Sequence, residues 1–100
     1  EIFGPVICLI PCKDEDDAIV IVNNSPYGLA GAIYTNNTNA AYRIARHLRT
    51  GTVGQNAPSA DFSIAFGGFK QSGIGREGGA KGLLPYLESK TILLSTVSKN

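Results

Sequence analysis

The sequence contains no methionine and no tryptophan, and only two of its 100 residues are cysteines. Because even position 1 is not methionine, we expect a processed chain or a piece excised from a longer protein. Cys8 and Cys12 allow at most one disulfide, which excludes a disulfide-rich scaffold and favours a reducing, cytoplasmic location. No apolar run approaches about 18 residues and no secretory leader pattern is present, so no membrane segment is expected.

Charge is also scarce, and it is unevenly placed along the chain. The sequence is 43% hydrophobic and 17% charged with a net charge of +1, which is typical of one soluble globular domain. Residues 1–40 hold five acids and one base, whereas residues 41–100 hold three acids and eight bases. Those eight bases are dispersed rather than gathered into a stripe, so nucleic-acid binding is not expected.

Strand-like and helix-like segments alternate, which predicts an α/β fold with parallel strand pairing and right-handed crossovers. The predicted strands cover residues 6–10, 29–34, 52–55 and 91–97. The predicted helices cover residues 18–22, 40–48 and 80–89, the last in spite of Pro85. A long glycine-rich loop at residues 56–82 separates the second helix and third strand from the third helix.

The first predicted helix follows a run of acids that begins at Asp14. Carboxylates suit a helix first turn, because they accept backbone N–H groups and meet the positive end of the helix dipole. The β-branched run at residues 19–22 also fits a strand. The acidic start and the sequence NNSP at residues 23–26 favour the helix.

The second predicted helix has one apolar stripe, with alanine, isoleucine and leucine recurring at spacings of three and four. Asn37, Thr38 or Asn39 is expected to cap its start, and Gly51 lies where the helix is released. Basic residues gather at its C-terminal end, where they meet the negative end of the dipole. His47 is therefore interpreted as a surface cation rather than a catalytic base.

Seven of the twelve glycines fall within residues 67–82. Phe66, Phe69 and their apolar neighbours do not suit a flexible linker, so an ordered, functional loop is expected there. Residues 73–78 fit the dinucleotide-binding pattern G-x-G-x-x-G, but no clean buried strand precedes them and no acid lies about twenty residues further on. The glycines are therefore interpreted as positions where the backbone turns sharply and packs closely.

Neither cysteine has an acidic or histidine neighbour that would activate a thiolate, and no second ligand pair accompanies them for zinc. Cys8 and Cys12 are therefore interpreted as small buried hydrophobic residues. The sequence also offers no Cys–His or Ser–His pair with an orienting acid. We expect this chain to contribute no catalytic residue and no metal site.

Several motifs occur in the order found in one known enzyme family. Residues 1–6 read EIFGPV, residues 27–30 read YGLA, residues 50–53 read TGTV, and residues 66–77 read FGGFKQSGIGRE. Asn56, Tyr86 and the sequence KTI at residues 90–92 complete the series. These motifs span essentially the whole chain, which resembles the C-terminal part of the aldehyde dehydrogenase superfamily.

The resemblance implies a partial aldehyde dehydrogenase catalytic domain at residues 1–90, followed by an oligomerisation strand and tail at residues 91–100. The strand from Thr91 to Val97 then joins subunits into a homo-oligomer. The family oxidises aldehydes to carboxylic acids with NAD or NADP through a cysteine thiohemiacetal. Its nucleophilic cysteine, general-base glutamate and Rossmann domain lie upstream, so the isolated chain is expected to be inactive and to bind no cofactor tightly.

The resemblance also assigns roles to three residues. Glu1 matches a glutamate that holds the hydroxyls of the nicotinamide-side ribose, since two carboxylate oxygens suit a vicinal diol. Phe3 matches a phenylalanine that packs near the nicotinamide ring and limits where hydride transfer occurs. Phe66 matches an aromatic residue that lines the substrate tunnel, and residues 57–64 shape the mouth of that tunnel.

Two residues depart from the family pattern. Ala65 stands in place of the usual proline and loosens the entry to the FGG turn. Gly79 beside Gly78 weakens the start of the last helix. The alternative function is a non-catalytic assembly module, in which the strand from Thr91 to Val97 pairs with other chains and no cofactor is bound. The motifs identify neither the aldehyde nor the choice between NAD and NADP.

Overall fold

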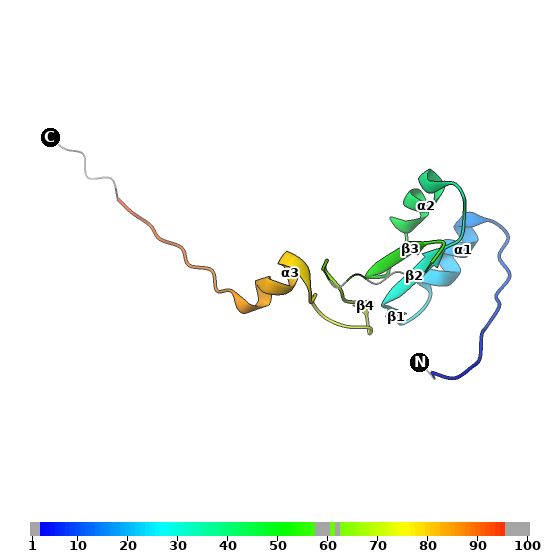
Figure 1. The fold of residues 1–100 in the computed structure, drawn as a ribbon, viewed down its shortest axis with the longest axis horizontal. Coiled ribbons are helices and arrows are strands. Elements are labelled where there is room, and N and C mark those ends of the chain that lie inside the picture. Colours follow the sequence, from blue (N-terminus) through cyan, green and yellow to red (C-terminus); the bar gives the residue numbers. More distant parts are fainter. Residues whose placement is uncertain (1–2, 58–60, 62, 96–100) are drawn as a thin grey trace.

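The computed structural model describes residues 3–57, 61 and 63–95, and it confirms the α/β class (Figure 1). The helices are α1 (Glu15–Asn23), α2 (Thr38–Ala45), α3 (Gly79–Leu83) and the 3₁₀ helix η1 (Leu84–Tyr86). The strands are β1 (Tyr27–Gly28), β2 (Ala30–Ile33), β3 (Thr52–Gln55) and β4 (Phe69–Lys70).

β2 and β3 form a parallel pair, as the alternation of strands and helices predicts. Ala30 lies opposite Thr52, and Ile33 lies opposite Gln55. The chain between them contains α2, which packs against both strands, and Ala41 on this helix is only 6% exposed. Side chains of α1, β2 and α2, among them Ile19, Ile33 and Ile44, line an open cavity between these elements.

Both long helices begin at the caps expected from the sequence. The Asp14 carboxylate accepts a hydrogen bond from the Asp17 backbone N–H at 2.9 Å, and α1 follows it at once. For α2 the cap is Asn37, whose Oδ1 accepts from the Ala40 N–H at 3.0 Å. Each of these bonds satisfies one backbone donor that the first helical turn leaves without a partner.

β1 and β4 pair antiparallel, with Tyr27 opposite Lys70 and Gly28 opposite Phe69. The sequence indicates only a turn at Tyr27 and Gly28 and no strand at Phe69 and Lys70. Two-residue strands carry no periodicity that a sequence pattern can report. The pair matters because it attaches the glycine-rich loop to the segment between α1 and β2.

The prediction of a strand at residues 6–10 is wrong in this chain. These residues form no regular structure, and Ile7 and Leu9 are 85% and 92% exposed. A strand needs a neighbour for its backbone groups, and no described segment lies beside this one as a pairing partner. Cys8 and Cys12 are exposed for the same reason, which corrects their interpretation as buried residues.

The predictions for the last thirty residues also need correction. Pro85 divides the helix expected at residues 80–89 into α3 and η1, since proline supplies no backbone N–H to continue it. The strand expected from Thr91 to Val97 is absent over residues 91–95, which are exposed and without regular structure. Thr96 and Val97 lie outside the described residues.

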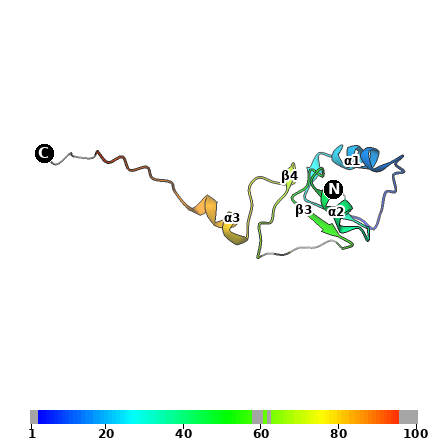
Figure 2. The same ribbon diagram turned by 90° about the horizontal axis from the view of Figure 1, so that it is seen from above.

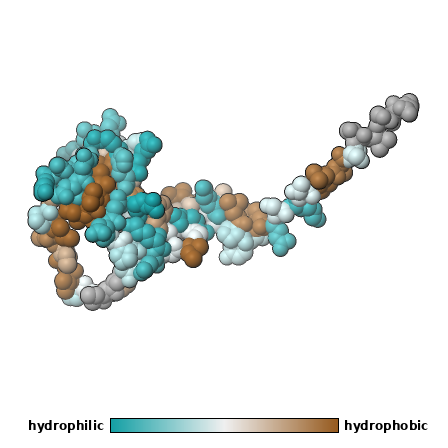
Figure 3. All heavy atoms as spheres, turned by 180° about the vertical axis from the view of Figure 1, so that it is seen from behind, coloured by the Kyte–Doolittle hydropathy of each residue, from teal (hydrophilic) through white to brown (hydrophobic). Residues whose placement is uncertain are grey.

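The described chain is drawn out rather than spherical. Its radius of gyration is 20.3 Å, whereas a compact domain of this length has about 13 Å. Figure 2 shows that α3 and the segment after it extend away from the body formed by α1, α2 and the strands. Apolar residues lie on the surface of the body and of both terminal segments (Figure 3).

The cap of α2 yields a stability prediction. Asn37→Ala removes the acceptor for the Ala40 N–H, so the free energy of unfolding is expected to fall by about 1 kcal/mol. Urea denaturation followed by circular dichroism at helical wavelengths measures the change. Asn39→Ala, an exposed change in the same first turn, is the control and should have no destabilising effect. Equal losses in both variants would contradict the assignment of the cap.

Candidate functional site

Residues 66–78, here called the glycine-rich block, form a loop that closes on itself. The backbone N–H of Phe66 donates to the Glu77 carbonyl at 2.7 Å, and the Glu77 N–H donates back to the Phe66 carbonyl at 2.8 Å. Phe66 is partly buried at this closure. These two hydrogen bonds therefore fix the backbone of Phe66, the predicted tunnel residue, to that of Glu77.

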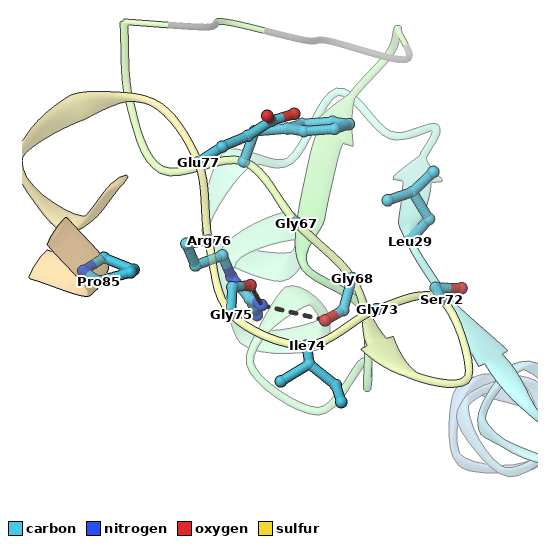
Figure 4. Close-up of a pocket in the computed structure, with 11 residues that line it drawn as sticks. Leu29, Gly67, Gly68, Ser72, Gly73, Ile74, Gly75, Arg76, Glu77 and Pro85 are labelled. Carbon is cyan, nitrogen blue, oxygen red and sulfur yellow. Dashed lines mark hydrogen bonds between the residues drawn. The ribbon is translucent and has the colours of Figure 1, made fainter. Parts of the chain in front are cut away.

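Arg76 joins two parts of the block through hydrogen bonds to backbone carbonyls. Its Nη1 donates to the Gly68 carbonyl at 3.0 Å and to the Gly75 carbonyl at 2.6 Å, as Figure 4 shows. Its guanidinium carbon also lies 5.3 Å from the centroid of the Phe69 ring, and that of Arg49 lies 5.6 Å from the same ring. Two cations on one aromatic ring fix the position of Phe69.

A second set of hydrogen bonds fastens the block to the segment between α1 and β2. The Gly28 N–H donates to Ser72 Oγ at 2.9 Å, and the Gln71 N–H donates to the Pro26 carbonyl at 2.9 Å. Lys70 Nζ donates to the carbonyls of Asn23 and Ser25 at 2.8 and 2.9 Å. These bonds and the β1–β4 pair act together along one edge of the block.

Close packing requires glycine at several positions, among them Gly51 and Gly68. A Cβ on Gly51 would collide with the carbonyl of Gly67, and a Cβ on Gly68 would lie 2.5 Å from the Cβ of Ser72. Both contacts are shorter than any that real side chains tolerate. Within the G-x-G-x-x-G match, the positive φ of Gly73, Gly75 and Gly78 confirms the expected sharp turns, whereas nothing lies within 4 Å of a Cβ on Gly75. The only α-helix after the G-x-G-x-x-G match within the described residues, α3, has five residues.

The block surrounds an open cavity of about 340 Å³, to which Leu29 and Pro85 also contribute (Figure 4). Most of its wall is backbone and apolar side chain, including the fully exposed Ile74. The Arg76 guanidinium, the cation in its wall, already binds two carbonyls. The wall of the cavity is therefore mixed, with apolar side chains from Leu29, Ile74 and Pro85 and polar ones from Ser72, Arg76 and Glu77.

Asp61 lies in the segment expected to shape the tunnel mouth, and hydrogen bonds from Ser63 lower the pKa of its carboxyl group. The Ser63 hydroxyl donates to Asp61 Oδ1 at 2.6 Å, and the Ser63 N–H donates to the same oxygen at 2.9 Å. These two bonds hold the pKa of Asp61 below its ordinary value of 3.8, with the hydroxyl as the larger cause. The hydrogen bonds from Ser63 thus stabilise the charged form of the carboxylate.

The predicted site residues occupy different parts of the chain. Glu1 lies outside the described residues. Phe3 belongs to the exposed N-terminal segment, with its side chain 93% exposed and its φ at +53°. Phe66 lies in the closure of the block. Sequence reasoning missed Asn23 and Lys70, because their contact joins residues that lie 47 positions apart in the chain.

The described residues contain neither a candidate metal site nor a helix that could span a membrane. Among residues 3–57, 61 and 63–95, no group of three or more histidine, cysteine or acidic side chains could hold a metal ion. No helix in the same residues is long and apolar enough to cross a membrane.

The fold and the site thus define a class of structure: an α/β unit with a parallel strand pair, to which a glycine-rich block is attached. A sequence model of the aldehyde dehydrogenase family matches residues 1–92. The chain belongs to this family. It spans about a fifth of the length of the curated relatives and solved structures it matches.

Relatives with named activities support this membership. The chain is 47% identical over 93 residues to the 3-succinoylsemialdehyde-pyridine dehydrogenase of a Pseudomonas species, covering 93% of this chain and 20% of that protein. It is 43% identical over 93 residues to aldehyde dehydrogenase [NAD(P)+] 1 of Saccharomyces cerevisiae, covering 92% of this chain and 18% of the yeast protein.

Solved structures show that the fold is also shared. An aldehyde dehydrogenase of Mycobacterium tuberculosis complexed with NAD+ matches 95% of this chain and 20% of its own, with a TM-score of 0.89 and 46% identity. Betaine aldehyde dehydrogenase of Staphylococcus aureus in complex with NAD+ matches 99% of this chain and 21% of its own, with a TM-score of 0.84 and 41% identity. The described chain is therefore a partial domain of the aldehyde dehydrogenase fold.

The close approach at Gly51 yields a prediction. Gly51→Ala places a methyl group against the Gly67 carbonyl, so the free energy of unfolding is expected to fall by about 1–3 kcal/mol. Chemical denaturation measures this loss. Gly4→Ala is the matched control, since nothing lies within 4 Å of a Cβ there, and it should be neutral or slightly stabilising. A neutral Gly51→Ala would show that the block does not pack on Gly51.

The Asp61 turn yields a pH prediction. Ser63→Ala removes the hydroxyl donor, so the pKa of Asp61 is expected to rise toward 3.8, as a carbon-13 NMR titration of its carboxyl group would measure. Because the folded pKa is depressed, the stabilisation by this turn is present above the unfolded pKa and lost as the pH falls through the folded pKa. Ser89→Ala is the control. An unchanged Asp61 titration in Ser63→Ala would refute the assigned cause.

Proposed function

We propose that this chain is part of an NAD(P)-dependent aldehyde dehydrogenase, which oxidises an aldehyde and water to a carboxylic acid while reducing NAD(P)+. The family match over residues 1–92 carries the proposal, since it includes both the EIFGPV segment and the glycine-rich block. The names of the relatives and the NAD+ complexes support the reaction and the cofactor.

The cofactor supplies a nicotinamide that accepts the hydride, and residues of the N-terminal segment are proposed to hold it. Glu1 presents two acceptor oxygens to the ribose diol, and Phe3 packs against the nicotinamide side. The environment of Phe3 fits this role, because its ring is 93% exposed and thus available to a flat, partly apolar partner. The relatives support NAD, and NADP is part of the proposal through the yeast relative's name.

The glycine-rich block is proposed to form part of the aldehyde tunnel through Phe66. The position of Phe66 in the cavity wall, with Leu29 and Pro85, supports this role, since a tunnel for uncharged aldehydes needs apolar side chains. The Phe66–Glu77 closure holds the backbone of the aromatic residue in place. Residues 57–64, of which 57, 61, 63 and 64 are described, are proposed to shape the entrance.

The cysteine nucleophile and the general-base glutamate are proposed to lie in parts of the protein outside this chain. Cys8 and Cys12 are exposed on a segment without regular structure, which does not hold either thiol in position for nucleophilic attack. The isolated chain is accordingly proposed to be inactive and to bind NAD(P) weakly.

An assembly role is the second candidate, and it is compatible with the first. Leu93 and Leu94 are 90% and 87% exposed in an extended segment, which suits pairing with a strand of another subunit. We propose a homo-oligomer joined through Thr91 to Val97. A cytoplasmic location stays a prediction from the sequence.

The ribose contact is tested in the full-length protein. Glu1→Gln keeps the shape of the side chain but removes its charge, so kcat/KM is expected to fall about 10- to 100-fold, the range for loss of a charged hydrogen bond. An aldehyde deuterated at its carbonyl carbon should show a larger isotope effect if hydride transfer has slowed. Asp16→Asn neutralises an exposed acid in α1 and serves as the control. Unchanged turnover and NAD affinity in Glu1→Gln would overturn the role of Glu1.

A further inference from the structure

Lys70 combines a positive φ with a side-chain contact to a distant part of the chain. Its φ is +55°, in the left-handed region that disfavours residues with a Cβ. Its ammonium reaches back to the α1–β1 connection, where it donates to the carbonyls of Asn23 and Ser25 at 2.8 and 2.9 Å. A residue held in a strained conformation persists only where surrounding contacts compensate for it. Here the compensating contacts are made by the ammonium.

The carbonyls that Lys70 binds lie at the C-terminal end of α1. This end carries the negative pole of the helix dipole, yet α1 has no basic residue in its own last turn. Lys70 supplies that cation from a segment 47 residues away in the sequence. The helix end and the glycine-rich block are thus joined by charge as well as by backbone hydrogen bonds.

Asn23 extends this junction to the chain that leaves α2. Its Nδ2 donates to the His47 carbonyl at 2.8 Å, and its Oδ1 accepts from the Arg49 N–H at 2.8 Å. The Asn23 side chain therefore binds the segment that follows α2, while the Asn23 backbone carbonyl binds Lys70. The junction fixes the position of β4 relative to both long helices.

The path from Lys70 to Phe66 is short and continuous. Phe69 precedes Lys70 in β4, and Arg76 lies over the Phe69 ring while it binds the Gly68 carbonyl. The next residue, Glu77, pairs with Phe66 through two backbone hydrogen bonds. A displacement of β4 is therefore passed to Phe66 through contacts that are all made by the glycine-rich block.

We propose that Lys70 is a positioning residue for the aldehyde subsite, where its ammonium clasps the end of α1 and thereby sets the position of Phe66. This inference rests on the proposed function, in which Phe66 lines the aldehyde tunnel. Lys70 touches neither substrate nor cofactor in this assignment. Its effect falls on KM for the aldehyde, whereas KM for NAD, whose proposed contacts lie in the N-terminal segment, is unaffected.

The test uses four variants of the full-length protein. Lys70→Met keeps a side chain of similar length, and hence the strain of a positive φ, but removes the ammonium. Lys70→Gly also removes the ammonium, yet it relieves the positive φ. Lys70→Arg restores a cation, and Lys81→Met removes an exposed lysine of α3 as the matched control. Kinetics with a panel of aliphatic and aromatic aldehydes are combined with amide hydrogen exchange of the peptides that cover residues 64–78.

Loss of the clasp should change both measurements in the same variants. Lys70→Met and Lys70→Gly are expected to raise KM for the aldehyde about tenfold, with KM for NAD within about twofold, and to exchange the Phe66 and Glu77 amides about tenfold faster. Lys70→Arg should recover most of both effects, and Lys81→Met should show neither.

The remaining outcomes separate this inference from the proposed function. Normal exchange and normal kinetics in Lys70→Met, or a wild-type-like Lys70→Gly, overturn the clasp. Faster exchange with an unchanged aldehyde KM overturns the assignment to the aldehyde subsite. A folded wild-type protein that oxidises no aldehyde in the panel overturns the proposed function itself, whatever the exchange of the Lys70 variants shows.

Discussion

Close backbone approach between the glycine-rich block and the main body is the constraint on which the described site depends. The Gly67 carbonyl lies where a side chain on Gly51 would be, and the Gly68 Cα lies 3.3 Å from the same position. At this separation, backbone groups of the block reach partners on the body, as in the bond from the Gln71 N–H to the Pro26 carbonyl. A side chain at Gly51 would separate the two surfaces and break these bonds. The glycines thus act by being small, and the polar contacts follow from that.

The parts of the fold that were predictable from the sequence depend on neighbours in the sequence. Asp14 and Asn37 cap helices through bonds to residues three positions away. The parallel pairing of β2 with β3 follows from a short strand–helix–strand unit, for which few chain paths are possible. In each case, a local pattern was enough to specify the structure.

The parts that could not be predicted depend on distant or missing neighbours. The β1–β4 pair joins Tyr27 to Lys70, and two-residue strands leave no pattern to recognise. Residues 6–10 and 91–95 have the composition of strands, but strand formation requires a pairing partner that the described chain does not provide. The motif identified Phe66 as a candidate, whereas the role of Lys70 depends on a positive φ and a contact across 47 residues, neither of which the sequence reports.

The two apolar terminal segments bear directly on how this chain acts. Phe3, Leu9, Leu93 and Leu94 are each about nine-tenths exposed. Burying each such side chain contributes about 1.5–3 kcal/mol, so the conformation of both segments depends on surfaces that the described body does not supply. A cofactor and an upstream domain would cover the first segment in the proposed function, and a second subunit would cover the other. The glycine-rich block differs from both terminal segments, because hydrogen bonds within the block hold the backbone of Phe66 in place without such a surface.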